Sequence, residues 1–203
     1  MPEMDGIEFT RRLKEDINTS HIPVILLTAK SSLENQMQGL ETGADDYITK
    51  PFSATYLKAR IENILRVRKK LQKYYASHSV DNQNSPEKIP DHPTLNSRDQ
   101  KFIDSITAVL EKELDNSDFT IDELVSQVGL GRTVFFKKLK ALTGLSPVEY
   151  IREFRLTRAI ALINSDEYNI SQISYMVGIS DPRYFSRCFK QKYGMTPTEY
   201  KEN

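Results

Sequence analysis

The chain has 203 residues and a formal net charge of zero, because 28 basic side chains balance 28 acidic ones. It has no apolar run near 18 residues and no basic-then-apolar start, so we expect neither a membrane span nor a signal peptide in this sequence. Its single cysteine excludes an internal disulfide. These features predict one or two soluble domains in the cytoplasm.

The first 76 residues alternate between helical and strand patterns. Runs rich in β-branched and apolar residues predict strands buried on both faces, whereas spacings of three and four predict amphipathic helices. Such alternation indicates an α/β unit with parallel strands and right-handed crossovers. The predicted elements are a helix through Ile7, Phe9 and Leu13, strands at 23–29 and 46–50, and helices at 32–42 and from Ser53 to about Tyr75.

Two polar side chains stand at the ends of these predicted strands. Thr28 ends the first strand and Lys50 ends the second, and the carboxyl ends of parallel strands meet at one edge of a sheet. A hydroxyl beside an ammonium suits a phosphoryl group. Taken alone, the pair also fits an ordinary strand-end threonine and a surface lysine.

Three strings in this region, MPEMDG, PVILLTA and GADDYITKPF, resemble the second half of a response-regulator receiver domain over residues 1–68. The resemblance implies that Thr28 is the switch hydroxyl, that Lys50 pairs with the phosphate and has a cis bond to Pro51, and that Tyr47 is the aromatic switch. The family's acidic pair and phosphorylated aspartate would precede Met1. We therefore name no phosphoacceptor here. No cofactor is expected, since magnesium would belong only to a complete receiver.

This departure leaves two interpretations of the first part of the chain. The sequence is either a fragment of a longer protein or a natural truncation that lacks phosphotransfer. We place the partial receiver and its extended last helix at 1–76, a linker at 77–96, and a helical domain at 97–203. The linker is predicted from three prolines among polar residues.

The end of the long helix carries charged residues beside an apolar stripe. The stripe fits either a short dimer seam or a solvated helix, because Arg68 interrupts it and barely two heptads are present. The stripe consists of Leu57, Ile61, Ile64, Arg68, Leu71 and Tyr75.

Further on, Ser97 and Gln100 predict a capping box for a helix that continues to Leu114.

The last part of the chain repeats one pattern. Apolar residues at helical spacing lead to Gly129 in the first copy and to Gly178 in the second, and a helix with a basic outward face follows each glycine. A short helix, a glycine turn and a second helix is the helix-turn-helix arrangement. One copy alone also fits an ordinary helical hairpin, but two matched copies about fifty residues apart favour a functional repeat.

A helix at 146–164 connects the two copies. It starts with a serine cap and a proline and carries apolar residues on its inner face. About eighteen residues at roughly 1.5 Å each give a rod of about 27 Å. Such a rod can hold two reading helices about one turn of DNA apart, which is roughly 34 Å.

Residues 118–200 resemble the DNA-binding domain of the AraC/XylS family of bacterial transcription regulators, most specifically in IxxIxxxVGIS-DPRYFSRCFK and YGMTPTEY. Two departures are Gly131, where the family often has a serine cap, and Cys188 at a usually apolar position. The family's contact positions imply two sets of DNA-binding residues. Those facing bases are Thr133, Phe136, Lys137, Arg183, Ser186 and Arg187, and those touching phosphates are Arg132, Lys138, Lys140 and Lys190.

Charge is distributed as this hypothesis requires. Residues 98–123 hold three basic and eight acidic side chains, whereas residues 131–203 hold twelve basic and seven acidic ones. The main hypothesis is therefore a two-component transcription regulator that binds double-stranded DNA and responds to a signal from a sensor kinase. RNA polymerase and a second copy of the chain are further candidate partners.

Two alternatives stay open. The chain also fits the C-terminal tail of a hybrid sensor histidine kinase, or a protein-interaction module with a phosphorylation-incompetent receiver remnant. A docking scaffold does not need a basic face on both reading helices, which favours DNA binding. We find no catalytic motif and no spacing of Cys and His suited to a metal, and we do not expect an enzyme.

Overall fold

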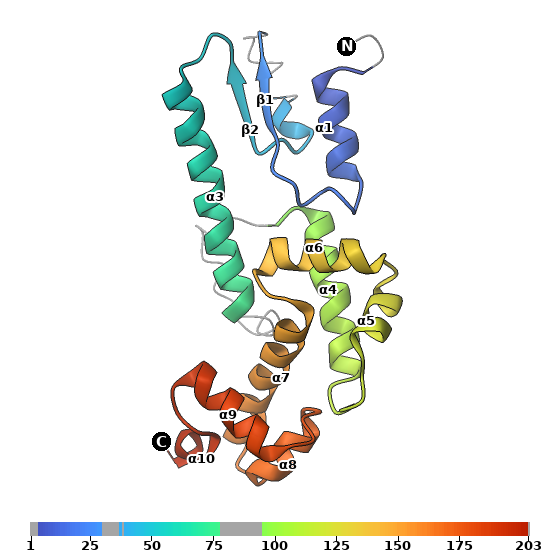
Figure 1. The fold of residues 1–203 in the computed structure, drawn as a ribbon, viewed down its shortest axis with the longest axis vertical. Coiled ribbons are helices and arrows are strands. Elements are labelled where there is room, and N and C mark those ends of the chain that lie inside the picture. Colours follow the sequence, from blue (N-terminus) through green and yellow to red (C-terminus); the bar gives the residue numbers. More distant parts are fainter. Residues whose placement is uncertain (1–3, 30–36, 38, 78–94, 203) are drawn as a thin grey trace. The chain divides into compact units, whose positions relative to one another are not determined.

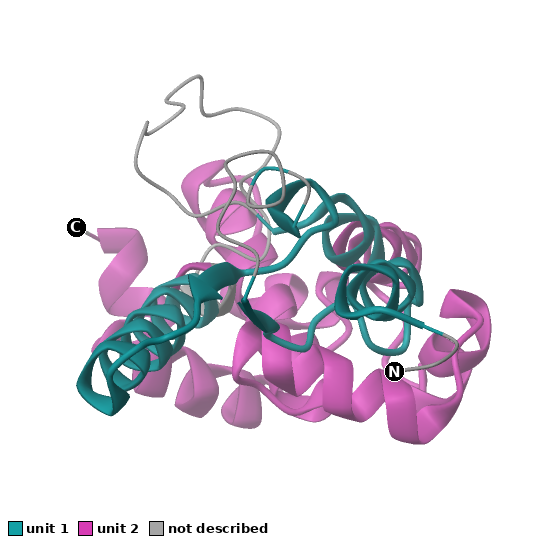
Figure 2. Cartoon of the chain, turned by 90° about the horizontal axis from the view of Figure 1, so that it is seen from above, with its two compact units in different colours: residues 1–73, 90–102 teal, residues 74–89, 103–203 magenta. Residues whose placement is uncertain are grey.

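The computed structural model describes residues 4–29, 37, 39–77 and 95–202. The chain divides into two compact units, one of residues 1–73 and 90–102 and one of residues 74–89 and 103–203 (Figure 2). Most of the predicted linker and of the helix predicted at 32–42 lies outside the described residues. No described helix is long and apolar enough to cross a membrane.

The first unit has the predicted α/β character. Its strands β1 (Ile25–Thr28) and β2 (Asp46–Thr49) pair in parallel, with Ile25 opposite Asp46 and Thr28 opposite Thr49. In Figure 1 the two strands run between α1 (Gly6–Glu15) and α3 (Ala54–Ser77). The expected parallel pairing is thus confirmed, with each strand somewhat shorter than the sequence pattern suggested.

Polar side chains tie these elements together. Asp5 caps α1 by accepting a 2.8 Å hydrogen bond from the amide of Glu8. Asp46, buried at the start of β2, accepts two hydrogen bonds from Arg60 on α3, one of them 2.6 Å long from Nη2. This link was not predicted from the sequence. The Arg60 hydrogen bond lowers the pKa of Asp46, although burial opposes the shift.

Helix α4 (Ser97–Lys112) starts differently from the prediction. Asn96 provides the cap, because its Oδ1 accepts a 2.8 Å hydrogen bond from the amide of Asp99. The predicted capping box of Ser97 and Gln100 is therefore wrong by one residue, since the asparagine side chain reaches the same donors from one position earlier. The helix ends at Lys112, before Leu114.

The second unit is entirely helical in its described part, as expected. Its central helix is α7 (Pro147–Asn164). This helix packs against α6 (Arg132–Thr143), α8 (Ile170–Met176), α9 (Pro182–Tyr193) and α10 (Pro197–Glu202). In Figure 1 it runs between the α4–α6 and α8–α10 groups. With 18 residues it is about 27 Å long. Before α6 lies α5 (Ile121–Val128).

Apolar side chains from the helical repeats form the interior of this unit. Leu124, Phe135 and Leu139 of the first copy are completely buried, and so are Ile173 and Phe185 of the second. The second copy packs with one end of α7 into a single cluster, which also receives Leu114 from the segment after α4. Each helix-turn-helix thus buries its own stripe, and α7 contributes to the packing of both copies.

Candidate nucleic-acid interface

The first helix-turn-helix consists of α5 and α6. Thr120 and Glu123 form a complete capping box at the start of α5, and Gly129 closes its end with a left-handed φ of 73°. A residue with a side chain is strained in that conformation, which explains the glycine. Gly131 precedes α6 and makes no side-chain cap, as its sequence departure predicts.

The second helix-turn-helix consists of α8 and α9. Asn169 and Gln172 form the capping box of α8, and Asp181 caps α9 by accepting a 2.9 Å hydrogen bond from the amide of Arg183. The turn between the helices is held by the buried hydroxyl of Ser174, which donates a 2.6 Å hydrogen bond to the carbonyl of Ile179. Both copies therefore have a defined turn, but only the second helix of the second copy starts with a side-chain cap.

Helix α6 presents several predicted contact residues to solvent. Arg132, Thr133, Lys137 and Lys140 are exposed, and Phe136 is half-buried. The Arg132 guanidinium lies 5.0 Å from the centre of the Phe136 ring and also forms an ion pair with Asp122 on α5. A cation held over an aromatic ring has fewer conformations to lose on binding.

Lys138 lies elsewhere. Its side chain is completely buried, with an exposed fraction of 0%. A phosphate contact needs an ammonium at the surface, so the assignment of Lys138 to the phosphate-binding set is wrong in this arrangement. The sequence shows two adjacent lysines, 137 and 138, but a helix turns by about 100° per residue and only one of them falls on the outward face.

Helix α9 presents the second set. Arg183, Arg187 and Lys190 are exposed, and Ser186 is half-buried. The Ser186 hydroxyl donates a 2.9 Å hydrogen bond to the carbonyl of Pro182, so its proton is used within the helix and its oxygen keeps acceptor capacity. The outward row thus combines three cations with one hydroxyl, a set that can bind base edges and phosphates.

Tyr184 lies beside the predicted contact residues of α9. It is 37% exposed, and Arg187 lies over its ring at 5.3 Å. Arg152 on α7 forms a side-chain hydrogen bond with Tyr184, which contributes to the raised pKa of that arginine although burial acts against it. The spacing of three between Tyr184 and Arg187 is the signal that indicates this pairing.

The receiver residues lie together at one end of the two strands. The amide of Lys50 donates a 2.7 Å hydrogen bond to the carbonyl of Thr28, which places the two backbones side by side as predicted. The Lys50 side chain is exposed and that of Thr28 half-buried. The peptide bond between Lys50 and Pro51 is cis.

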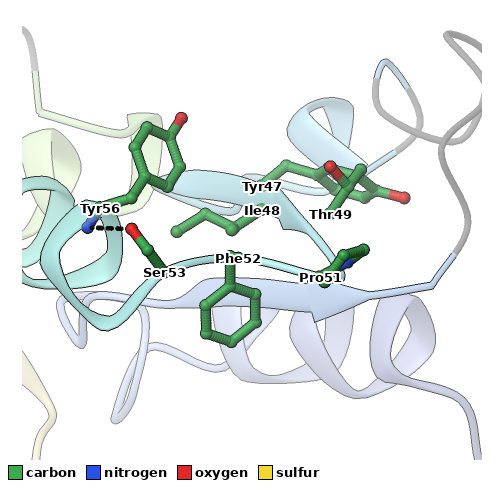
Figure 3. Close-up of a pocket in the computed structure, with 7 residues that line it drawn as sticks. All are labelled: Tyr47, Ile48, Thr49, Pro51, Phe52, Ser53 and Tyr56. Atoms are coloured by element: carbon green, nitrogen blue, oxygen red, sulfur yellow. Dashed lines mark hydrogen bonds between the residues drawn. The ribbon is translucent and has the colours of Figure 1, made fainter.

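Tyr47 borders a shallow polar pocket of about 480 Å³ (Figure 3). Beside it, the Ser53 hydroxyl accepts a 3.1 Å hydrogen bond from the amide of Tyr56. Among the described residues no group of His, Cys, Asp and Glu is suited to a metal ion. The pocket is lined by Tyr47, Ile48, Thr49, Pro51, Phe52, Ser53 and Tyr56.

The two units define the class of protein: a parallel α/β segment joined to a double helix-turn-helix. Residues 1–62 match the response regulator receiver domain family, and residues 124–203 match a helix-turn-helix domain family. The chain thus combines a segment similar to the receiver family with a domain similar to the helix-turn-helix family.

Two curated relatives match different lengths of the chain. The chain is 42% identical over 200 residues to histidine kinase P4 of Formosa agariphila, which covers 98% of this chain and 14% of that protein. It is 58% identical over 66 residues to the phosphate regulon transcriptional regulatory protein PhoB of Pseudomonas aeruginosa, or 32% of this chain and 29% of that protein. The chain therefore spans less than a third of the length of each of these relatives.

Among solved structures, a transcriptional regulator from Chromobacterium violaceum, described as an AraC-type DNA-binding domain-containing protein, is 25% identical. The similarity covers 53% of this chain and 95% of that one, with a TM-score of 0.49. The C-terminal domain of the response regulator AraT from Geobacillus stearothermophilus is 24% identical, covering 50% and 84%, with a TM-score of 0.46.

Proposed function

We propose that this chain binds double-stranded DNA in a sequence-specific manner and regulates transcription as the output part of a two-component phosphorelay. The observation that carries this proposal is the repeated placement of exposed cations on the second helix of each helix-turn-helix. In such motifs this helix enters the major groove. The receiver segment supports a link to a cognate sensor kinase domain in the cytoplasm.

We divide the contact residues of the proposed interface into two groups, those that face bases and those that contact phosphates. Thr133, Phe136 and Lys137 of α6, with Arg183, Ser186 and Arg187 of α9, are proposed to face bases. Arg132, Lys140 and Lys190 are proposed to contact phosphates, with Lys138 removed from that set because it is buried. Residues 97–203 are the proposed DNA-binding domain, while RNA polymerase and a second copy of the chain are proposed partners.

Selection of binding sites from a random duplex library tests this proposal. The chain should enrich a motif with two half-sites about one helical turn apart. Its affinity should fall steeply with salt, because each neutralised phosphate contributes about −0.9 to the slope of log K against log salt. Binding with no enriched motif, or with a slope near zero, would refute sequence-specific DNA recognition.

A second proposal concerns the protein to which this activity belongs. Nearly the whole chain aligns with part of a protein named histidine kinase P4, which favours the output region of a hybrid sensor kinase over a free-standing regulator. This segment is then not itself an enzyme, and the kinase chemistry belongs to other domains. The complete open reading frame that contains this sequence decides between a hybrid sensor kinase and a free-standing regulator, since only the hybrid carries kinase domains in the same chain.

A further inference from the structure

The turns of the two helix-turn-helix units each contain a left-handed glycine, but the two glycines have different surroundings. Gly129 and Gly178 both adopt a left-handed φ, of 73° and 71°. A Cβ added at Gly129 would meet nothing within 4 Å. At Gly178 it would come within 2.4 Å of the carbonyl oxygen of Leu114 and 2.9 Å of the Arg155 guanidinium. The second turn is therefore packed against other parts of the domain, whereas the first is open.

The side chain of Arg155 is one of the groups that pack against the turn at Gly178. From α7 its Nη1 donates a 2.9 Å hydrogen bond to the carbonyl of Gly178, and its Nη2 donates a 2.7 Å hydrogen bond to the carbonyl of Asn116. One rigid, planar guanidinium therefore joins the turn of the second helix-turn-helix to the segment between α4 and α5. Burial lowers the pKa of Arg155, but an arginine remains charged, so both hydrogen bonds are charge-assisted.

The segment that Arg155 reaches is itself well anchored. The carbonyl of Asn116 also accepts a 3.3 Å hydrogen bond from the amide of Phe119, and the Asn116 side chain donates to Glu113 at 3.0 Å. Leu114, two residues earlier, packs into the hydrophobic cluster of the second helix-turn-helix. A segment that leads directly into α5 of the first unit is thus fastened to the turn of the second.

The sequence repeat shows that this position has diverged. A shift of forty-nine residues aligns Gly178 with Gly129, and the same shift aligns Arg155 with Ile106. Ile106 is completely buried in α4. The first copy therefore has the buried Ile106 at this position, whereas the second has Arg155, which also donates a hydrogen bond to Asn116 outside its own copy.

We propose that Arg155 is a positioning residue that sets the orientation of α9 relative to α6, and so the spacing of half-sites that the chain accepts. The part about half-sites rests on the proposed DNA-binding function. The part about orientation rests on the described contacts alone. Arg155 lies within α7 and is half-buried, so its role is to hold the two reading helices in one arrangement.

The first experiment needs no DNA. Cysteines introduced for spin labels at Lys137 on α6 and Lys190 on α9, with Cys188→Ser, report the distance between the reading helices in the full chain. We expect a narrow distance distribution in this background and a broader or shifted one after Arg155→Met. Arg155→Lys, which keeps the charge but not the two-pronged geometry, should fall between them. Unchanged distributions in both variants would overturn the proposal.

Arg158→Met is the matched control. Arg158 lies one turn along α7 and pairs with Glu111 of α4, so its replacement removes the same charge from the same helix without touching the turn at Gly178. We expect its distance distribution to stay close to that of the background. Equal broadening in both Met variants would refute a special role for Arg155. If Arg155→Met does not fold, which circular dichroism shows, the Arg155→Lys result decides.

The second experiment uses duplexes whose half-sites are moved apart by one or two base pairs. The parent chain should bind one spacing most tightly. In Arg155→Met the ratio between the affinity for this spacing and the affinity for the others should fall roughly tenfold, which is the effect of removing a hydrogen bond to a charged group. Affinity for a single half-site should not change. A parent that binds no duplex refutes the proposed function, while the spin-label result still decides the positioning role.

Discussion

The guanidinium of Arg187 lies over the ring of Tyr184, 5.3 Å from its centre, on the exposed face of α9. Tyr184 is in turn joined to Arg152 on α7 by a side-chain hydrogen bond. The arginine therefore starts from a supported position on the helix that is proposed to enter the major groove. Supporting a side chain before binding reduces the entropy that binding costs.

Arg187→Ala should relax specificity at one base pair. An arginine can form two hydrogen bonds with a guanine, and such a pair contributes about 1–3 kcal/mol of discrimination. The measurement is a binding-site selection carried out in parallel on the parent and the variant. Lys190→Ala is the control, because loss of a phosphate contact should weaken all sites alike. Identical motifs from the parent and Arg187→Ala would show that Arg187 reads no base.

Lys138→Met should leave the salt dependence of DNA binding unchanged, because Lys138 is buried. The exposed Lys140, two residues further along α6, is the matched comparison. Lys140→Met should reduce the slope of log K against log salt by about 0.9, the value for one phosphate contact. Fluorescence anisotropy titrations across a salt series measure both slopes. A reduced slope for Lys138→Met would mean that this lysine reaches the DNA after all.

Two residues inserted after Ala161 should abolish binding to the full site. Ala161 lies on the exposed side of α7, and the insertion turns the second helix-turn-helix by roughly 200° relative to the first. The first copy should keep its fold, because it buries its own apolar stripe, whereas the insertion separates Ile163 from Leu156 and Ala159 within the cluster of the second copy. Footprinting measures the outcome, and circular dichroism checks the helical content. A footprint that still covers both half-sites would show that the connection is flexible.

The ion pair between Asp46 and Arg60 should make the first unit lose stability in acid. The Arg60 hydrogen bond lowers the pKa of Asp46 below its ordinary value of 3.8. A carboxylate with a lowered pKa stabilises the folded state above its unfolded pKa, and this contribution disappears as the pH falls through the folded pKa. The free energy of unfolding of the parent should therefore decrease in that window.

Asp46→Asn should remove this part of the pH dependence and destabilise the unit near neutral pH by about 1 kcal/mol, a modest value because Arg60 is partly exposed. Urea denaturation followed by the NMR signal of the Ile48 methyl group measures both effects. Glu62→Gln is the control, since Glu62 is an exposed acid on α3 whose contact with Lys58 is 3.9 Å long. Parallel pH profiles for the parent and Asp46→Asn would contradict the assignment.

The strand β1 should be weakly protected in this chain. Among the described residues it pairs only with β2, Leu27 is 41% exposed, and Val24, Ile25 and Leu26 are only half-buried. An unpaired strand edge with exposed apolar side chains invites association. We expect hydrogen exchange across residues 24–27 to be faster than in α7, with self-association at high concentration. Strong, concentration-independent protection would contradict this expectation.

Much of the fold could be predicted because the signals are local. The run from Val24 to Leu27 has no polar residue, which predicts a strand, and left-handed glycines mark the ends of α5 and α6. The expected burial of this strand on both faces was wrong, since Leu27 is 41% exposed. The Thr28 and Lys50 positions also followed from strand order. Contacts between distant residues carry no such signal. The pairing of Asp46 with Arg60 depends on how α3 lies against β2, which spacing within either element does not reveal.

The interface shows the same limit at the level of single side chains. Helical spacing separates inward from outward residues only in steps of about 100°, so positions near the border of the two faces are assigned poorly. Lys138 was predicted to lie on the outward face, but its side chain is buried. Arg155 reads as one more charged residue of α7, since its role depends on carbonyl groups thirty-nine and twenty-three residues away.

Both reading helices end in the same way. Gly144 and Gly194 close α6 and α9 with left-handed φ values of 77° and 81°. A hydroxyl and a glutamate follow in each copy, Ser146 with Glu149 and Thr196 with Glu199, and each pair exchanges hydrogen bonds across the start of the next helix. Among the outward side chains of α6 and α9, Lys140 and Lys190 also interact electrostatically with these two glutamates. Outward residues other than these two lysines can therefore be exchanged without changing the glycine and the hydroxyl–glutamate pair that end each helix.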